Sequence, residues 1–205
     1  MTAFTLLACT RKSDSRPILN GIIGLLLLLY LWLPGLAQAD ATHIRSAEIV
    51  RSEGGYVLNA DIELSLNARL ADALHRGVGL YFSTEIRVER PRWYWFDRVV
   101  VQRSIDYRLS YNAITRSYRL SMGSLHQNFE QLEAALRVMQ RIRNWQIADQ
   151  SALEAGVSHD AALRFRLDTS QLPRPFQVTT IGSRDWNINT DWLTWTFLPG
   201  VAGQR

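Results

Sequence analysis

The chain of 205 residues contains a single cysteine, Cys9, and a single lysine, Lys12. Both lie in an N-terminal segment with the pattern of an export signal, so the rest of the protein has neither residue. This excludes disulfide bonds and thiol chemistry there, and stability must come from a buried core. Positive charge beyond this segment is carried by arginine, which binds carboxylates and phosphates through paired hydrogen bonds and stacks on aromatic rings.

Clusters of positive charge are also lacking. Without residues 1–39 the basic residues fall from 23 to 20 and the acidic residues from 19 to 18, which leaves a net charge of +2. Both signs are scattered, whereas proteins that bind nucleic acid concentrate Lys and Arg on one surface. We therefore expect no nucleic-acid partner.

The short motifs of several large enzyme classes are absent. The sequence has no Gly-x-Ser-x-Gly elbow, no His-Glu-x-x-His zinc helix, no phosphate-binding loop and no dinucleotide fingerprint. Its histidines occupy separate segments without the spacing of metal ligands. They are His43, His75, His126 and His159. We expect no cofactor, no metal ion and no catalytic residues.

The N-terminal segment has the three parts of an export signal. Basic residues precede an apolar run over residues 18–33, and the small residues Ala37 and Ala39 follow it. This order predicts cleavage after Ala39. The alternative is a retained membrane anchor, but the run is shorter than the roughly 20 residues of a membrane span and contains Asn20.

Residues 40–205 are expected to form a single β-rich domain, separate from the signal segment of residues 1–39. They contain no internal repeat, no low-complexity tract and no long linker, and their number suits one domain. Cleavage would leave this domain in the periplasm. Retention would hold it at the inner membrane, facing the periplasm.

Alternating apolar and polar residues predict that this domain is mainly β. An alternation over residues 44–51 is expected to pair with the next one through the turn Glu53-Gly54-Gly55. Arg103 interrupts the apolar row of a later strand. The other alternations cover residues 56–66, 78–89, 99–111, 118–122, 163–167 and 193–197.

Two segments have the period of a helix. Asn67 is expected to cap a short helix that ends at Gly77. A longer helix is expected to begin at Asn128, where Gln131 completes a capping box, and to bury an apolar stripe over residues 129–139. Together these elements favour an antiparallel β-sandwich with one longer and one short α-helix over a closed barrel.

Two prolines interrupt the region before the last strand. Pro173 and Pro175 are expected to exclude both helix and central strand from residues 172–176.

Four consecutive aromatic residues among arginines form the candidate binding surface. Pro91 ends the preceding strand, which places them at or beside a sheet edge. Alternate residues of an extended segment point to opposite faces, so one pair can enter the core while the other meets solvent or a partner. The competing interpretation packs or covers the second pair as well. The candidates are Arg90, Arg92, Trp93, Tyr94, Trp95, Phe96 and Arg98.

A second aromatic group lies over residues 186–197. If the two groups meet, they form an aromatic floor that belongs either to the core or to a pocket.

Several segments in combination carry a resemblance to a known family. They are the run His75–Phe82, the charged strand Glu85–Arg90, the aromatic segment Arg92–Asp97, Tyr107–Tyr111, the helix at Asn128 and the closing Trp192–Pro199. Over nearly all of residues 43–199 they are similar to the proteobacterial domain of unknown function 4390 family. The resemblance implies an exported envelope protein, with genes near those of a membrane sensor kinase of the nitrogen-regulation type. It implies no catalytic residues.

Three functions are open at this point. The first is a noncatalytic periplasmic binding or interaction module, whose partner is a membrane sensor kinase or another envelope protein. The second is an envelope enzyme acting on glycan or lipid, which needs a cleft that joins Asp or Glu to a His or to a second carboxylate. The third is a structural or assembly factor of the envelope, which needs a long unpaired edge strand without charges or prolines.

Overall fold

The computed structural model describes residues 42–92, 98–180 and 184–200. The chain divides into Met1–Ala39 and Asp40–Arg205, and the fold below is that of the second unit. Its elements in chain order are β1 (His43–Ser52), β2 (Gly55–Glu63), α2 (Ala68–His75), β3 (Leu80–Arg90), β4 (Arg98–Asn112), β5 (Ser117–Met122), β6 (Leu125–Phe129), α3 (Leu132–Gln140), β7 (Arg141–Ala148), β8 (His159–Leu167), η1 (Thr169–Gln171), α4 (Arg174–Thr180), η2 (Arg184–Trp186) and β9 (Leu193–Phe197).

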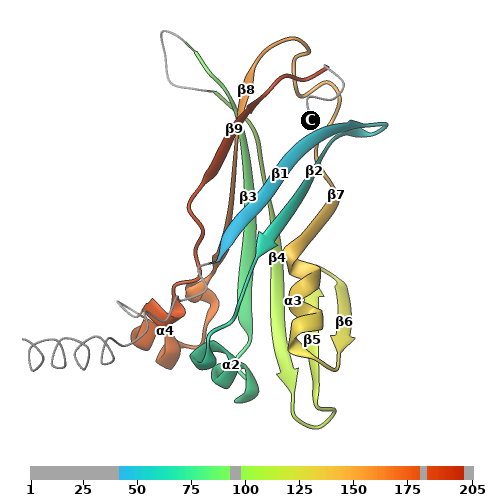
Figure 1. The fold of residues 1–205 in the computed structure, drawn as a ribbon. Helices are drawn as coiled ribbons and strands as arrows, with labels where there is room; N and C mark the ends of the chain where they lie inside the picture. Colours follow the sequence, from blue (N-terminus) through green and yellow to red (C-terminus); the bar gives the residue numbers. More distant parts are fainter. Residues whose placement is uncertain (1–41, 93–97, 181–183, 201–205) are drawn as a thin grey trace, which may run out of the picture. The chain divides into compact units, whose positions relative to one another are not determined.

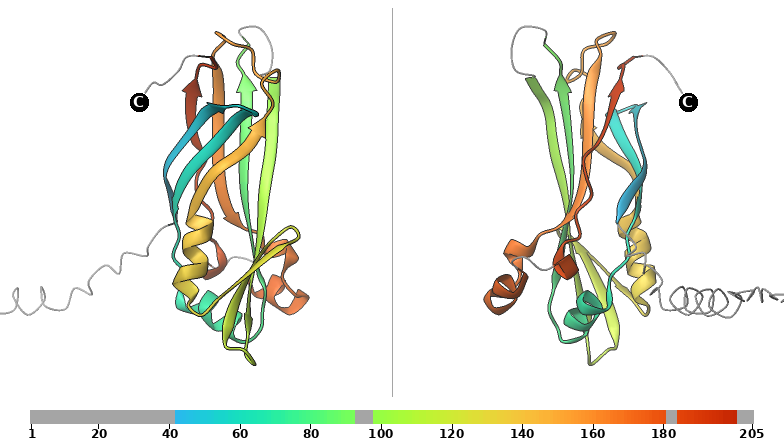
Figure 2. Two further views of the ribbon diagram at one scale, coloured as in Figure 1. Left: turned by 90° about the vertical axis from the view of Figure 1, so that its right-hand side faces the viewer. Right: turned by 60° about the vertical axis from the view of Figure 1, so that its left-hand side comes forward.

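The strands of the described residues form two antiparallel sheets (Figure 1). The small sheet has the order β1-β2-β7, and the large sheet has the order β6-β5-β4-β3-β8-β9. Figure 2 shows the two sheets as separate layers. The predicted mainly β fold of two antiparallel sheets is therefore confirmed.

One hydrophobic core joins the two sheets. The small sheet contributes Leu58 and Ile62, and the large sheet contributes Phe82, Ile86 and Phe165. The rings of Phe82 and Phe165 stack with their centroids 5.6 Å apart, and these residues are 1% and 0% exposed. Removal of such side chains from water is the main force that holds the two layers together.

The predicted hairpin between the first two strands is confirmed, because Ser52 pairs with Gly55 across the turn. Gly55 also lies directly against the end of β7. Its φ is +138°, and a Cβ at this position would lie 2.1 Å from the carbonyl oxygen of Ala148. Only glycine fits the turn and this close approach of two backbones.

The short helix is also as predicted. Asn67 caps α2, since its side-chain oxygen accepts a hydrogen bond from the backbone N–H of Leu70 at 3.0 Å. At the other end the N–H of Gly77 donates to Leu74 and the N–H of Val78 donates to Ala73. This is the Schellman arrangement, with Gly77 in the left-handed position.

The second predicted helix begins later than expected, and the capping box at Asn128 was wrong. Residues 125–129 form β6, in which Asn128 pairs with Arg119 of β5 and accepts a hydrogen bond from its side chain at 3.2 Å. Pairing with β5 provides hydrogen-bond partners for the backbone of this segment, so it forms a strand despite the helical pattern at Asn128. The helix α3 starts at Leu132 and still buries Leu136 and Met139 against β2, β5, β6 and β7.

A third helix, α4, contradicts the expectation that the two prolines exclude helix from residues 172–176. Pro175 is the second residue of α4, and a helix provides no partner for the N–H groups of its first turn, so proline is tolerated there. The carbonyl of Pro173 accepts hydrogen bonds from the N–H groups of Phe176 and Gln177 at 2.8 and 3.2 Å. None of the helices in the described ranges is long and apolar enough to cross a membrane.

Candidate functional site

Polar side chains cover the face of the large sheet that points away from the core, here called the outer face. The buried apolar residues of β3, β4 and β8 face the core, so the residues between them lie on the outer face. The register sets Glu85 of β3 between Ser104 of β4 and Arg164 of β8. The outer-face residues of these three strands include Ser83, Glu85, Arg87, Gln102, Ser104, Asp106, Arg164 and Arg166.

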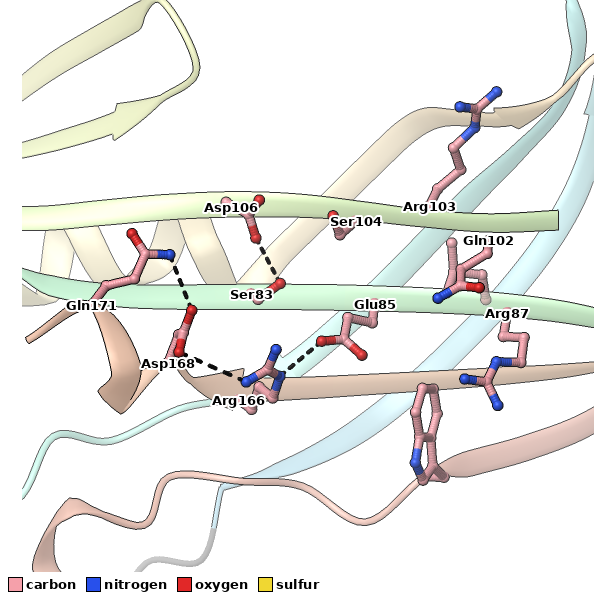
Figure 3. Close-up of a pocket in the computed structure, with 12 residues that line it drawn as sticks. Ser83, Glu85, Arg87, Gln102, Arg103, Ser104, Asp106, Arg166, Asp168 and Gln171 are labelled. Carbon is pink, nitrogen blue, oxygen red and sulfur yellow. Dashed lines mark hydrogen bonds and ion pairs between the residues drawn. The ribbon is translucent and has the colours of Figure 1, made fainter. Parts of the chain in front are cut away.

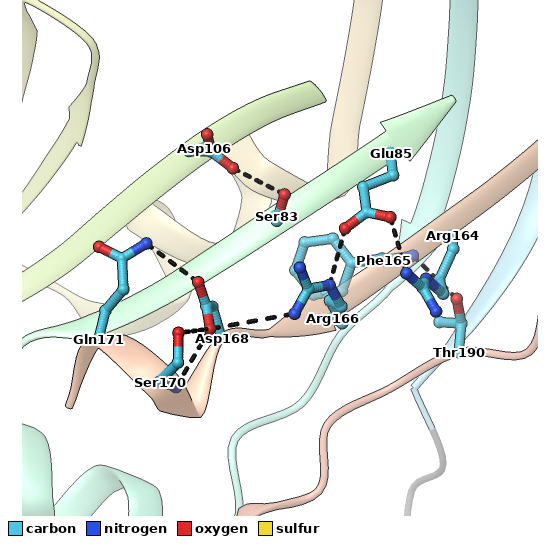
Figure 4. Close-up of polar contacts among 10 residues, drawn as sticks. All are labelled: Ser83, Glu85, Asp106, Arg164, Phe165, Arg166, Asp168, Ser170, Gln171 and Thr190. Atoms are coloured by element: carbon cyan, nitrogen blue, oxygen red, sulfur yellow. Dashed lines mark hydrogen bonds and ion pairs between the residues drawn. The ribbon is translucent and has the colours of Figure 1, made fainter. Parts of the chain in front are cut away.

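Glu85 is the centre of an ion-pair network on this face (Figure 4). Its Oε2 accepts a hydrogen bond from Arg164 Nη2 and its Oε1 accepts one from Arg166 Nε, both at 2.7 Å. Burial acts to raise the pKa of Glu85, but the two arginines outweigh it and hold the pKa below the usual 4.5. Glu85 therefore stays ionised and fixes two guanidinium groups in place.

Replacing Glu85 with glutamine is expected to remove a pH-dependent part of the stability. Because the folded pKa lies below the unfolded value, the contribution of Glu85 is fully present above about pH 4.5 and is lost as the pH falls through the folded pKa. At pH 7 we expect Glu85→Gln to lower the free energy of unfolding by about 1–2 kcal/mol, a modest value because the carboxylate is partly exposed.

Urea denaturation of both proteins at several pH values measures this difference. The gap between wild type and Glu85→Gln should close as the pH drops below 4.5. A gap that stays constant with pH would contradict the ion-pair assignment.

Asp168 closes one end of the network, just after β8. Its Oδ1 accepts hydrogen bonds from the N–H and hydroxyl of Ser170 at 3.1 and 2.6 Å, and its Oδ2 accepts one from Gln171 Nε2 at 3.0 Å. These bonds and the nearby Arg166 outweigh the effect of burial, so the pKa of Asp168 lies below the usual 3.8. In the same row the hydroxyl of Ser83 donates to Asp106 at 2.7 Å.

Trp192 lies on the outer face, beside a β-bulge, because it directly precedes Leu193, the partner of core-facing Leu163. Leu163 of β8 pairs with Leu193, but Arg166 bridges to Asn189. Two residues of β8 thus face three residues of the neighbouring segment, which is the definition of a bulge. Thr190 stabilises it: its N–H donates to the carbonyl of Phe165 at 2.9 Å, and its hydroxyl accepts from the N–H of Phe165 at 3.0 Å.

The indole of Trp192 contacts two arginines. The guanidinium carbon of Arg164 lies 4.4 Å from the ring centroid, and that of Arg87 lies 5.4 Å from it. Both distances suit cation–π attraction. The Nε atoms of the two arginines are buried and make no hydrogen bond, which fits donors that lie beneath an aromatic ring. Trp192 and these arginines therefore form one rigid wall.

The outer face holds a groove made of two adjoining cavities. The first has a volume of about 370 Å³ and is lined by Trp192, Arg87 and the side chains around Glu85 (Figure 3). The second, of about 380 Å³, continues toward Tyr81 and His126. The two share Asp106, Asp168 and Gln171. We call this pair of cavities the groove.

The groove brings together the residue types that an enzyme would need. Asp106 and Asp168 line both cavities, Glu85 lines the first and His126 lines the second. A cleft that joins carboxylates to a histidine, as the enzyme alternative requires, is therefore present. However, the lowered pKa values of Glu85 and Asp168 keep both as acceptors only, whereas hydrolysis of a glycosidic bond needs a carboxyl group with a raised pKa as general acid.

The surface predicted from the sequence lies mostly outside the described residues. Trp93, Tyr94, Trp95 and Phe96 belong to residues 93–97, so their burial is not tested, and the same holds for the cleavage residues Ala37 and Ala39. Three flanking arginines are described. Arg90 pairs with Arg98 at the ends of β3 and β4, and its side chain forms an ion pair with Glu154 at 2.6 Å. Arg92 and Arg98 are exposed.

Sequence reasoning did not identify the groove. The polar rows of β3 and β4 were visible as alternation, but the contacts of Trp192 with Arg87 and Arg164 depend on the pairing of β8 with β3 and β9. Arg164 and Arg166 likewise alternate with the apolar residues of β8. No group of three or more His, Cys, Asp or Glu side chains in the described part of the chain is arranged to hold a metal ion.

The fold and the groove define a domain of two antiparallel sheets with a polar groove on one sheet face. A family model described as "Domain of unknown function (DUF4390)" matches residues 39–196. The chain belongs to the DUF4390 family, as its sequence predicted. No curated protein matches the chain. No solved structure matches it either.

Proposed function

We propose that the chain is a noncatalytic binding module of the cell envelope, and that the groove on the outer face is its binding site. The observation that carries this proposal is the placement of Trp192. Its indole lies outside the core, on a row of fixed charged and polar side chains. An indole outside the core does not contribute the free energy that its burial there would give. Aromatic side chains in such positions are typical of binding sites.

The two alternatives fit the contacts less well. An enzyme acting on glycan or lipid finds its carboxylates in the groove, but Glu85 and Asp168 are held ionised. An assembly factor that offers a sheet edge needs a long edge strand without charges. Among the described edge strands, β1 and β7 are long but carry charges, such as Arg45 and Glu48 in β1 and Arg141 and Arg143 in β7. The edges β6 and β9 have five residues each.

The location and the partner of the domain are proposed from the sequence. The export signal supports a periplasmic domain, or one anchored at the inner membrane and facing the periplasm. The family resemblance supports a membrane sensor kinase as one partner to test.

Site-specific photocrosslinking tests the proposal. A diazirine amino acid is placed at Gln102, which lines the groove, in the full chain expressed in its host. We expect irradiation to give a covalent adduct that mass spectrometry detects. The matched control is Gln127, an exposed residue of β6 whose backbone pairs with buried Leu120 and which therefore lies on the opposite face of the sheet.

An adduct at position 102 and none at position 127 supports the groove as the binding site. No adduct at position 102, or equal yields at both positions, overturns the proposal. The noncatalytic part is tested separately: glycans and lipids of the envelope incubated with the full chain should keep their chain length and acylation.

A further inference from the structure

The charges that surround the first cavity balance. Among the residues that line it, Glu85, Asp106 and Asp168 are matched by three arginines, Arg87, Arg103 and Arg166. The three carboxylates accept hydrogen bonds from groups of the chain itself. A balanced lining produces little net field, so it does not concentrate phosphates or cations. The first cavity therefore favours a ligand without net charge.

The groove offers hydrogen-bonding groups that the chain leaves available. Gln102 and Ser104 line the first cavity, and their side chains make no hydrogen bond to other described residues. An amide and a hydroxyl each donate and accept. They form one row along β4 with Asp106, which is already fixed as an acceptor (Figure 3). A ligand that matches this row carries several groups that also donate and accept, which is the chemistry of hydroxyl groups.

Each cavity also has an aromatic side chain. Trp192 lines the first and Tyr81 lines the second, where the guanidinium of Arg108 lies 5.6 Å from the ring centroid. An aromatic ring beside polar groups suits a molecule with one apolar face and a polar rim. A sugar ring has this form, because its C–H bonds point to its faces and its hydroxyl groups lie around its edge.

Other ligand classes fit less well. Binding of an acyl chain requires a mainly apolar lining, and the central part of a protein interface is poor in Asp and Glu. The first cavity has few apolar side chains and is lined by three carboxylates. The second cavity is more apolar, with Tyr81, Phe82 and Tyr107 in its lining, but it shares Asp106, Asp168 and Gln171 with the first, so the ligand extends over both.

We propose that the groove binds a neutral carbohydrate chain of several sugar rings, with one ring packed on the indole of Trp192 and its hydroxyl groups hydrogen-bonded to Gln102 and Ser104. This inference rests on the proposed function, since it names the ligand class of the same groove.

An array of soluble neutral oligosaccharides of hexoses and N-acetylhexosamines, two to eight rings long, tests the inference with the full chain. We expect saturable binding to at least one chain of three rings or more. Trp192→Ala should raise the Kd at least about tenfold, as for an aromatic residue central to an interface. Gln102→Ala should raise it about three- to tenfold through the lost hydrogen bonds. Gln127→Ala should leave it unchanged.

Gln102 is exposed and makes no described contact that folding needs, so this variant keeps the test valid if Trp192→Ala is destabilised. No binding anywhere on the array overturns the carbohydrate assignment, and so does binding that Gln102→Ala leaves unchanged. A photoadduct at position 102 that is a polypeptide or a lipid also overturns it, while it supports the groove as a binding site. Absence of any adduct overturns the proposed function itself.

Discussion

Replacing Phe165 with alanine is expected to lower the free energy of unfolding by about 3–5 kcal/mol. Phe165 is fully buried and its ring stacks on Phe82. The truncation removes this contact and leaves a cavity in the core that joins the two sheets, which relaxes only in part. A domain of this size is stable by about 5–15 kcal/mol, so the loss is a large fraction of the total.

The midpoint of urea denaturation, followed by circular dichroism, measures the loss. Leu125→Ala is the control, because Leu125 of β6 is 65% exposed and its truncation should change the stability by less than about 0.5 kcal/mol. Similar midpoints for Phe165→Ala and wild type would show that the two sheets do not share the core described here.

Replacing Gly55 with alanine is expected to lower the free energy of unfolding by about 2–5 kcal/mol. The left-handed φ of +138° strains any residue with a Cβ. In addition, the new methyl group would lie 2.1 Å from the carbonyl oxygen of Ala148 and 2.9 Å from the Cα of Asp149. Both are backbone atoms, so the clash can be relieved only if β7 shifts against β2. Such a shift is costly, as for other kinds of overpacking.

Two other glycines separate the causes. At Gly77 the φ is +88° but a Cβ would meet nothing within 4 Å, so Gly77→Ala should show the backbone strain alone, about 1 kcal/mol. At Gly54 a Cβ would make only ordinary contacts with Gln146, and Gly54→Ala should be nearly neutral. Thermal melting of the three variants gives the comparison. Equal effects at Gly54 and Gly55 would contradict the close approach of β2 and β7.

Alternation was sufficient to predict the central strands. In β3 the apolar residues Phe82, Ile86 and Val88 are buried, because a strand with one face in the core allows no other register. Arg103 was correctly singled out: it pairs with Ile86 on the core side of β4 but is exposed. The hairpin at Gly55 and the cap at Asn67 follow from turn and cap chemistry that acts over a few residues.

The errors arose where distant pairing decided the outcome. Asn128 and Phe129, predicted to begin a helix, instead end β6, because β5 lies beside them and pairs with their backbone. The strand β7 was not predicted, since its pairing with β2 shifts register twice and Asn144 adopts a positive φ of 52°. Irregularities of this kind break the period of two on which the prediction depends.

The candidate site shows the same limit. The sequence drew attention to the aromatic run at Trp93, whereas the described site is built around Trp192, which the sequence placed only in a general aromatic group. Glu85 lies about 80 positions before Arg164 and Arg166 in the chain and meets them only because β8 pairs with β3. No local pattern contains that pairing.

The claim that Trp192 forms the wall of a binding groove is tested most directly by ¹⁹F NMR of the full chain labelled with 5-fluorotryptophan. The Trp192 resonance is assigned with Trp192→Phe, and a solubilised envelope extract of the host is then titrated. We predict that the Trp192 resonance shifts or broadens while that of the buried Trp186 stays in place. A Trp192 resonance that does not respond over the whole titration would contradict the account.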